Sequence, residues 1–267
     1  MPEVVLNAKN ISIEFGGLKA VENFSIEIKE GELVGLIGPN GAGKTTVFNM
    51  LTGVYLATSG SIELRGQDVT KTSPHKRVEI GISRTFQNIR LFKRMSVLEN
   101  VKLSANVHMN YGIFEGIFKT KKYWEQEEKA TAEAMEILKD LGLEQYANEE
   151  AQNLPYGKQR KLEIARALAS HPAILCLDEP AAGMNPIETE ELMETIKIVR
   201  EKYKTAILLI EHDMKLVMGI CEWIKVLCFG KEIASGTPEE IKNNPEVISA
   251  YLGEWYYVRC KKTICYL

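Results

Sequence analysis

The segment GPNGAGKT, residues 38–45, constrains this chain more than any other stretch of its sequence. It fits the pattern GxxxxGK[ST] at every fixed position. It follows the continuous apolar run Leu33–Ile37, which is typical of a strand buried on both faces. It also opens a helical pattern that runs to about Leu51. A chance Gly-rich loop is the alternative, but the strand before the segment and the helix after it favour a phosphate-binding loop.

The residues of such a loop have distinct chemical roles. The glycines let the backbone curl so that successive N–H groups face phosphate oxygens, and the helix N-terminus adds its dipole. Lys44 is expected to reach the β- and γ-phosphates of ATP and to assist catalysis, and the Thr45 hydroxyl is expected to bind Mg²⁺. The predicted nucleotide-binding residues are Gly38, Pro39, Asn40, Gly41, Ala42, Gly43, Lys44, Thr45 and Thr46.

Polar side chains also follow two later apolar runs. The run Ile174-Leu-Cys-Leu ends in Asp178 and Glu179. Asp178 is predicted to hold Mg²⁺ through water, and Glu179 to polarise the attacking water as general base. The run Ala206–Ile210 leads to His212, which is predicted to contact the γ-phosphate because parallel strands collect ligand-binding groups at their carboxyl ends. Solvated acids and a structural histidine are the alternatives.

The hydrophobic patterns predict an α/β fold. Val4–Phe15 and residues 24–28 alternate apolar and polar residues, which indicates half-exposed antiparallel strands. Residues 97–141 have a helical pattern, within which residues 111–122 are expected to form a loop or a short helical insertion. Further on, buried strands alternate with helices, which indicates a mostly parallel sheet covered on both faces. The remaining elements are predicted at residues 61–64, 158–169, 173–177, 187–203, 206–210 and 214–220.

Composition excludes several functional classes. The formal net charge of 267 residues is −3, so no strong basic field favours nucleic-acid binding. The N-terminus does not resemble a secretory signal, and no apolar run is long enough to span a bilayer. The five cysteines form no CxxC pair, which favours free thiols over a zinc site; they are Cys176, Cys221, Cys228, Cys260 and Cys265.

Several motifs occur in a fixed order along the chain. They are the phosphate loop, Gln87 after Arg84-Thr-Phe, the segment Leu154-Pro-Tyr-Gly-Lys-Gln159, the strand end Asp178-Glu179, and His212. This order resembles that of ABC-transporter ATPases, and the resemblance covers about residues 4–254. Finer features make the chain similar to LivG-type ATP-binding subunits of branched-chain amino acid importers; they are Phe15-Gly-Gly-Leu18, Arg84-Thr-Phe-Gln-Asn-Ile-Arg-Leu-Phe92, Ala181-Ala-Gly-Met-Asn-Pro186, Glu211-His-Asp-Met-Lys-Leu-Val-Met-Gly219 and Tyr251-Leu-Gly-Glu254.

The resemblance implies a RecA-like P-loop NTPase core with an antiparallel β subdomain and an inserted helical subdomain. Residues 1–254 are expected to form one ABC ATPase domain, with its core in 1–87 and 153–254 and its helical part in 88–152. The tail, residues 255–267, lies beyond the resemblance, and its role stays open. Gln87 matches a glutamine that contacts Mg²⁺ and water. Phe15 matches an aromatic residue that stacks on adenine; an ordinary strand residue is the alternative.

The resemblance also implies partners. One partner is a second ABC ATPase subunit, which is expected to be a different chain, although a homodimer stays open. The signature segment of this chain would complete the ATP site of that partner; it comprises Leu154, Pro155, Tyr156, Gly157 and Lys158. The segment lacks the serine that the wider family has, and Asn185 stands where an aspartate is usual. These departures leave the equivalence of the two composite ATP sites open.

Two transmembrane permease subunits would hold the chain peripherally at the cytoplasmic face of the membrane. The cargo is not encoded here, because an ATPase subunit does not touch the transported solute. The alternatives are an ATPase of another transporter, such as one for lipopolysaccharide export, and an ABC ATPase that acts outside transport. One phosphate loop and a helical insertion of ordinary size favour the transporter.

Overall fold

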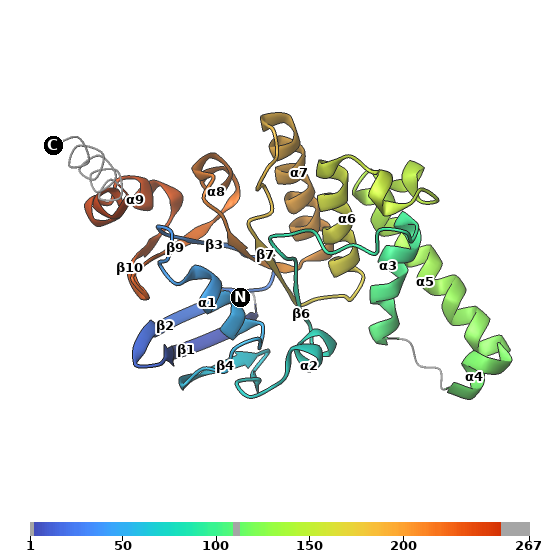
Figure 1. Ribbon diagram of the computed structural model, residues 1–267, viewed down its shortest axis with the longest axis horizontal. Helices are drawn as coiled ribbons and strands as arrows, with labels where there is room; N and C mark the ends of the chain where they lie inside the picture. Colours follow the sequence, from blue (N-terminus) through green and yellow to red (C-terminus); the bar gives the residue numbers. More distant parts are fainter. Residues whose placement is uncertain (1–2, 109–112, 252–267) are drawn as a thin grey trace. The chain divides into compact units, whose positions relative to one another are not determined.

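Two units make up the computed structural model, which describes residues 3–108 and 113–251 (Figure 1). The first unit comprises Met1–Pro74 and Ala206–Leu267, and the second comprises His75–Thr205. The expected helical subdomain, residues 88–152, falls within the second unit, and its status as a separate subdomain stays a prediction. The tail from residue 255 lies outside the described residues.

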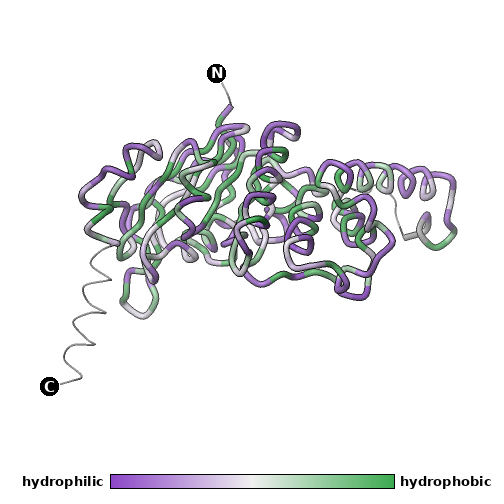
Figure 2. The backbone as a smooth tube through the Cα atoms, turned by 90° about the horizontal axis from the view of Figure 1, so that it is seen from above, coloured by the Kyte–Doolittle hydropathy of each residue, from purple (hydrophilic) through white to green (hydrophobic). Residues whose placement is uncertain are grey.

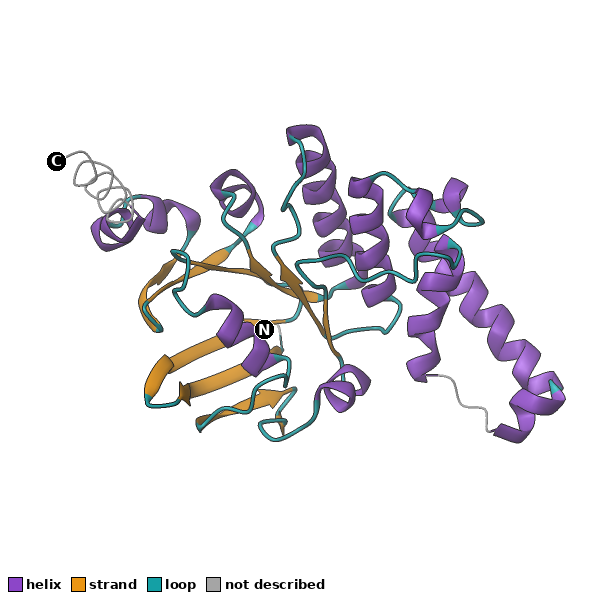
Figure 3. Ribbon diagram, in the orientation of Figure 1, coloured by secondary structure: helices purple, strands orange, loops and turns teal. Residues whose placement is uncertain are grey.

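An antiparallel sheet opens the first unit (Figure 3). Strand β1 (Val4–Phe15) pairs with β2 (Leu18–Lys29) across a tight Gly-Gly turn, and β4 (Ser59–Leu64) pairs with the other edge of β1. The short strand β5 (Gln67–Asp68) follows beside β4. The predicted half-buried strands are confirmed, since buried and exposed positions largely alternate along β1 and β2.

A second group of strands in the first unit carries the phosphate loop. Strand β3 (Leu33–Ile37) lies between β8 (Ala206–Ile210) and β9 (Trp223–Cys228), parallel to both. Strand β10 (Lys231–Gly236) pairs antiparallel with β9. Every residue of β3 and β8 is buried, as their continuous apolar sequences predict. The sequence analysis did not predict β9 and β10.

The helices of the first unit are short. Helix α1 (Lys44–Leu51) begins and ends where the sequence predicts, and it buries Val47, Phe48, Met50 and Leu51. Helix α8 (Met214–Ile220) begins after Asp213, whose side chain accepts two backbone N–H groups, and α9 (Pro238–Lys242) begins with a capping box at Thr237.

The second unit combines a strand pair with several helices. Strand β6 (Ile82–Arg84) runs parallel to β7 (Ile174–Asp178). Helix α3 (Val97–Ala105) packs against two later helices, α5 (Lys121–Asp140) and α6 (Tyr156–Leu168), and α6 packs against α7 (Pro186–Tyr203). Helix α4 spans Ile113–Phe118; α2 (Pro74–Glu79) precedes β6, and 3₁₀ turns occupy Asn106–His108, Glu144–Tyr146 and Ala151–Asn153.

Helix α5 shows how little of a helix needs to be apolar. It buries Ala130, Ala134, Ile137 and Leu138, which recur at helical spacing along its second half. Its first half is mostly exposed, and the helix is coloured largely hydrophilic in Figure 2. Across the described residues, no helix combines the length and apolar character that crossing a bilayer requires.

Candidate nucleotide and catalytic site

The phosphate loop has backbone conformations that require glycine at two positions. Gly38 follows β3 with φ of 149°, and a Cβ there would lie 2.1 Å from the carbonyl oxygen of Leu227. Gly43 has φ of 102°, and a Cβ there would lie 2.9 Å from the carbonyl oxygen of Ala20. The loop therefore lies close against neighbouring backbone at both positions, and neither has room for a larger residue.

The end of the loop combines a lysine ammonium with a helix N-terminus. The Nζ atom of Lys44 donates to the carbonyl oxygens of Gly38, at 2.6 Å, and Pro39, at 2.9 Å, so the buried ammonium lies inside the curl of the loop. No side chain caps the N-terminus of α1 at Gly43, and Thr45 is exposed in its first turn. A helix N-terminus beside a lysine ammonium suits bound phosphate.

An aromatic pair lies at the end of the first hairpin. Phe15 is 46% exposed, and its ring contacts that of Tyr55 edge-to-face, with centroids 5.3 Å apart. Sequence reasoning singled out Phe15 and missed Tyr55; the only signal was an aromatic residue shortly after the glycine that ends α1. An exposed ring held by a second ring suits base stacking, and that role for Phe15 stays a prediction.

His212 follows the strand beside the loop's own strand. Because β8 runs parallel to β3, the residues after both strands meet at one edge of the sheet, as predicted. The backbone N–H of His212 donates to Oε2 of Glu211 at 3.0 Å, and the Glu211 side chain is buried. Glu211 therefore orders the turn that carries His212.

In the second unit, the buried Asp178 carboxylate forms an ion pair. Its Oδ2 atom lies 3.3 Å from Nη2 of Arg84, which ends the neighbouring strand β6. Burial raises the pKa of the Asp178 carboxyl, while the Arg84 charge opposes that rise. Arg84 was noted in the sequence only as part of a motif. A carboxylate at a strand end supplies the hard oxygen ligand that Mg²⁺ prefers, so the donor fits the expected metal.

Gln87 and Glu179 are brought together although 92 positions separate them. The Nε2 atom of Gln87 donates to Oε2 of Glu179 at 2.6 Å. Glu179 has φ of 47°, a left-handed conformation that costs a residue other than glycine about 1–3 kcal/mol. Such strain is concentrated at functional sites, which agrees with a catalytic role for Glu179.

Comparison with known proteins places this geometry in a family. Residues 21–182 match the ABC transporter family, and residues 231–254 match a family described as branched-chain amino acid ATP-binding cassette transporter. The chain belongs to the ABC transporter ATP-binding family. It is 50% identical over 254 residues to the high-affinity branched-chain amino acid transport ATP-binding protein LivG of Salmonella typhimurium, covering 95% of this chain and 100% of that protein.

Two further relatives are less similar in sequence to the chain. The corresponding protein BraF of Pseudomonas aeruginosa is 46% identical, with 95% and 100% of the two chains covered. The lipopolysaccharide export ATP-binding protein LptB of Haemophilus influenzae is 32% identical, with 94% and 98% covered.

Among solved structures, the ADP conformation of an ABC transporter ATP-binding cassette has a TM-score of 0.81 and 31% identity, covering 94% of this chain and 99% of that one. A dimeric cassette bound to ADP and Pi has a TM-score of 0.71 and 26% identity, covering 87% and 98%. The chain is thus an ABC-type, nucleotide-binding ATPase with the fold that the sequence predicts.

In this ABC ATPase the signature segment is bonded to its own chain. The Tyr156 hydroxyl donates to the carbonyl oxygen of Ala182 at 2.9 Å. Gly157 packs against Glu188, so a Cβ at Gly157 would lie 3.0 Å from Oε1 of that residue. The Lys158 ammonium lies 4.5 Å from the centre of the Tyr146 ring. No side chain caps α6 at Pro155, so its first N–H groups suit an anion.

Asn185 acts as a helix cap. Its Oδ1 atom accepts the backbone N–H groups of Ile187 and Glu188, each at 3.0 Å, and the Glu188 side chain accepts the N–H of Asn185. The Asn185 side chain, which stands where an aspartate is usual, therefore caps α7 of its own chain.

Cys176 and Cys221 are buried free thiols, as expected. Burial raises the pKa of Cys176 and of Cys221 to about 12, which makes both thiols poor nucleophiles. Cys260 and Cys265 lie outside the described residues.

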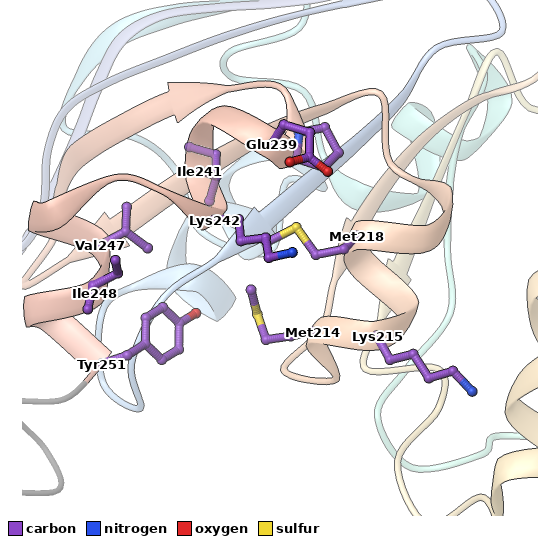
Figure 4. Close-up of a pocket in the computed structure, with 10 residues that line it drawn as sticks. Met214, Lys215, Met218, Glu239, Ile241, Lys242, Val247, Ile248 and Tyr251 are labelled. Carbon is purple, nitrogen blue, oxygen red and sulfur yellow. The ribbon is translucent and has the colours of Figure 1, made fainter.

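A separate apolar groove of about 550 Å³ lies between α8 and the residues around α9 (Figure 4). Met214 and Met218 line it from α8, and Ile241, Val247 and Tyr251 line it from the later segment. No residue of the phosphate loop lines this groove, so it is distinct from the nucleotide site.

Proposed function

We propose that this chain hydrolyses ATP to power import of branched-chain amino acids (leucine, isoleucine and valine) through partner membrane subunits. The observation that best supports this class of transported solute is the match of residues 231–254 to the branched-chain transporter family. Identity supports it, since the chain is 50% identical to a branched-chain transport subunit and 32% identical to a lipopolysaccharide export subunit.

In the proposed reaction, the phosphate loop holds ATP, and Lys44 neutralises charge on the β- and γ-phosphates. Thr45, Gln87 and Asp178 are the proposed Mg²⁺ ligands, with Asp178 acting through water; the metal would neutralise charge that develops on the transferred phosphate. Glu179 takes a proton from the attacking water, and the hydrogen bond from Gln87 orients its carboxylate. His212 is the proposed contact to the γ-phosphate.

The proposed assembly contains two ATP-binding subunits and two membrane permeases. Each phosphate loop would face the signature segment of the other ATPase subunit, and ATP binding would close the pair. A different ATP-binding subunit is the proposed partner, because segment 154–158 and Asn185 depart from the usual family pattern, which suits two unequal composite ATP sites. The complex would place this chain at the cytoplasmic face of the membrane.

The test uses the tagged chain purified from its native membranes in mild detergent. Mass spectrometry is expected to identify two permease subunits and a second ATP-binding subunit. Reconstituted into vesicles with its solute-binding protein, the complex is expected to take up leucine in the presence of ATP. Recovery of lipopolysaccharide export proteins, or of ribosomes without a membrane protein, would contradict the proposal.

A further inference from the structure

A fully buried arginine outside the motifs described above donates hydrogen bonds to the backbone at Gln87 and at the residue before it. Arg160 lies on α6 and is 0% exposed. Its Nη1 atom donates to the carbonyl oxygen of Phe86 at 2.7 Å, and its Nη2 atom donates to the carbonyl oxygen of Gln87 at 2.8 Å. The planar fork of a guanidinium can span two successive carbonyl groups, and an ammonium lacks that geometry.

Glu163, one turn further along α6, contacts both Arg160 and the same backbone segment. Its Oε2 atom lies 2.7 Å from Nη1 of Arg160, and its side chain is 1% exposed. Its Oε1 atom lies within 3.4 Å of the backbone nitrogens of Phe86 and Arg90. A buried ion pair is weak evidence for stability, because desolvation of both charges offsets their attraction. The placement of the pair around one backbone segment points to positioning.

The held segment leads directly to the proposed general base. Arg160 fixes the main chain of Gln87, and the Gln87 side chain donates to Glu179 at 2.6 Å. This short hydrogen bond depends on the position of the Gln87 backbone. The position matters for the reaction, because a misplacement of about 1 Å at a catalytic group can reduce the rate about 100-fold.

We propose that Arg160, paired with Glu163, is the positioning residue that holds Gln87 against Glu179. The proposal rests on the functions proposed above for Gln87 and Glu179. It also gives α6 a second role. The helix that begins with the signature segment fixes the segment that orients the catalytic base. Tyr156 of the signature segment contacts Arg160 directly, because its hydroxyl lies 3.4 Å from Nη2 of Arg160.

The test is a double-mutant cycle on the assembled transporter with Arg160→Lys, Gln87→Ala and the combination. Arg160→Lys keeps the charge beside Glu163 and loses the fork. It is expected to lower the single-turnover rate of ATP hydrolysis about 10-fold in the parent and less than about 2-fold in the Gln87→Ala background, with ATP affinity changed less than about 3-fold.

Arg166→Lys is the matched control. Arg166 lies on the same helix, and its Nη1 atom donates to the carbonyl oxygen of Arg90, three positions after Gln87. Its effect is expected to be the same with and without Gln87→Ala. If Arg160→Lys does not fold, as judged by circular dichroism, the Arg160→Met/Glu163→Met pair replaces it in the cycle, because that pair leaves no buried charge unpaired.

The outcomes distinguish a failure of this inference from a failure of the proposed function of Gln87. If Gln87→Ala lowers the rate and Arg160→Lys lowers it equally in both backgrounds, Arg160 does not act through Gln87 and the inference is wrong. The inference is also wrong if Arg160→Lys leaves the parent rate unchanged. If Gln87→Ala leaves the rate unchanged, the proposed function of Gln87 fails and the inference fails with it.

Discussion

The phosphate loop and the acidic segment after β7 are built on different principles. The loop is one continuous run of eight residues, and its proposed phosphate-binding groups are backbone N–H groups and the ammonium of Lys44. The acidic segment depends on side chains that come from distant positions, with Arg84 on Asp178 and Gln87 on Glu179. The first region fixes shape through glycine, and the second fixes charge and direction through paired side chains.

This difference separates two tasks. Phosphate binding needs a curled backbone, which eight residues can encode by themselves. Water activation needs a carboxylate held in one direction, which several segments must supply together. The loop should therefore be sensitive to added atoms, and the acidic segment should be sensitive to removed charges.

Gly38→Ala should have the largest effect on nucleotide affinity. The added Cβ would lie 2.1 Å from a backbone carbonyl oxygen, so the loop must move. ATP affinity, measured by isothermal titration calorimetry, is expected to fall at least about 100-fold.

Gly41→Ala is the matched control in the same loop. A Cβ at Gly41 would meet nothing within 4 Å, so only its left-handed backbone, with φ of 78°, is strained. Affinity is expected to fall about 10-fold at most. Equal losses for the two variants would show that packing behind the loop does not matter.

The same contrast explains what the sequence could predict. The loop, β3 and α1 follow from adjacent residues, and their bounds agree with the prediction. The strands β9 and β10 were missed although Trp223–Cys228 partly alternates, because the weak pattern lies beside a helix signal. The Arg160–Glu163 pair reads in sequence as an exposed helical pair, and only tertiary packing shows that it is buried.

Asp178→Asn should have an intermediate effect, and it changes charge while keeping shape. The Mg²⁺ concentration for half-maximal ATPase activity is expected to rise about 10-fold, since the metal loses a negative partner. ATP affinity measured without Mg²⁺ serves as the internal control and should change less than about 3-fold. An unchanged Mg²⁺ requirement would remove Asp178 from the metal site.

Tyr156→Phe should have the smallest effect. It removes the hydroxyl that donates to Ala182 and accepts from Arg160 at 3.4 Å, and it keeps the ring beside Gly183. Chemical denaturation should show a free energy of unfolding lower by about 0.5–1.5 kcal/mol, the usual net contribution of a hydrogen bond, because the contact with Arg160 is long. Tyr156→Ala also removes the ring and should cost more. If the two variants were equally destabilising, the ring would contribute nothing.

The separation between binding and hydrolysis is tested most directly by Glu179→Gln. Equilibrium ATP affinity and single-turnover hydrolysis should be measured on the same preparation, with exposed Glu201→Gln on α7 as the control. The account predicts an affinity within about 3-fold of the parent and a hydrolysis rate lower by at least about 100-fold. Hydrolysis at the parental rate would contradict the assignment of Glu179 as general base.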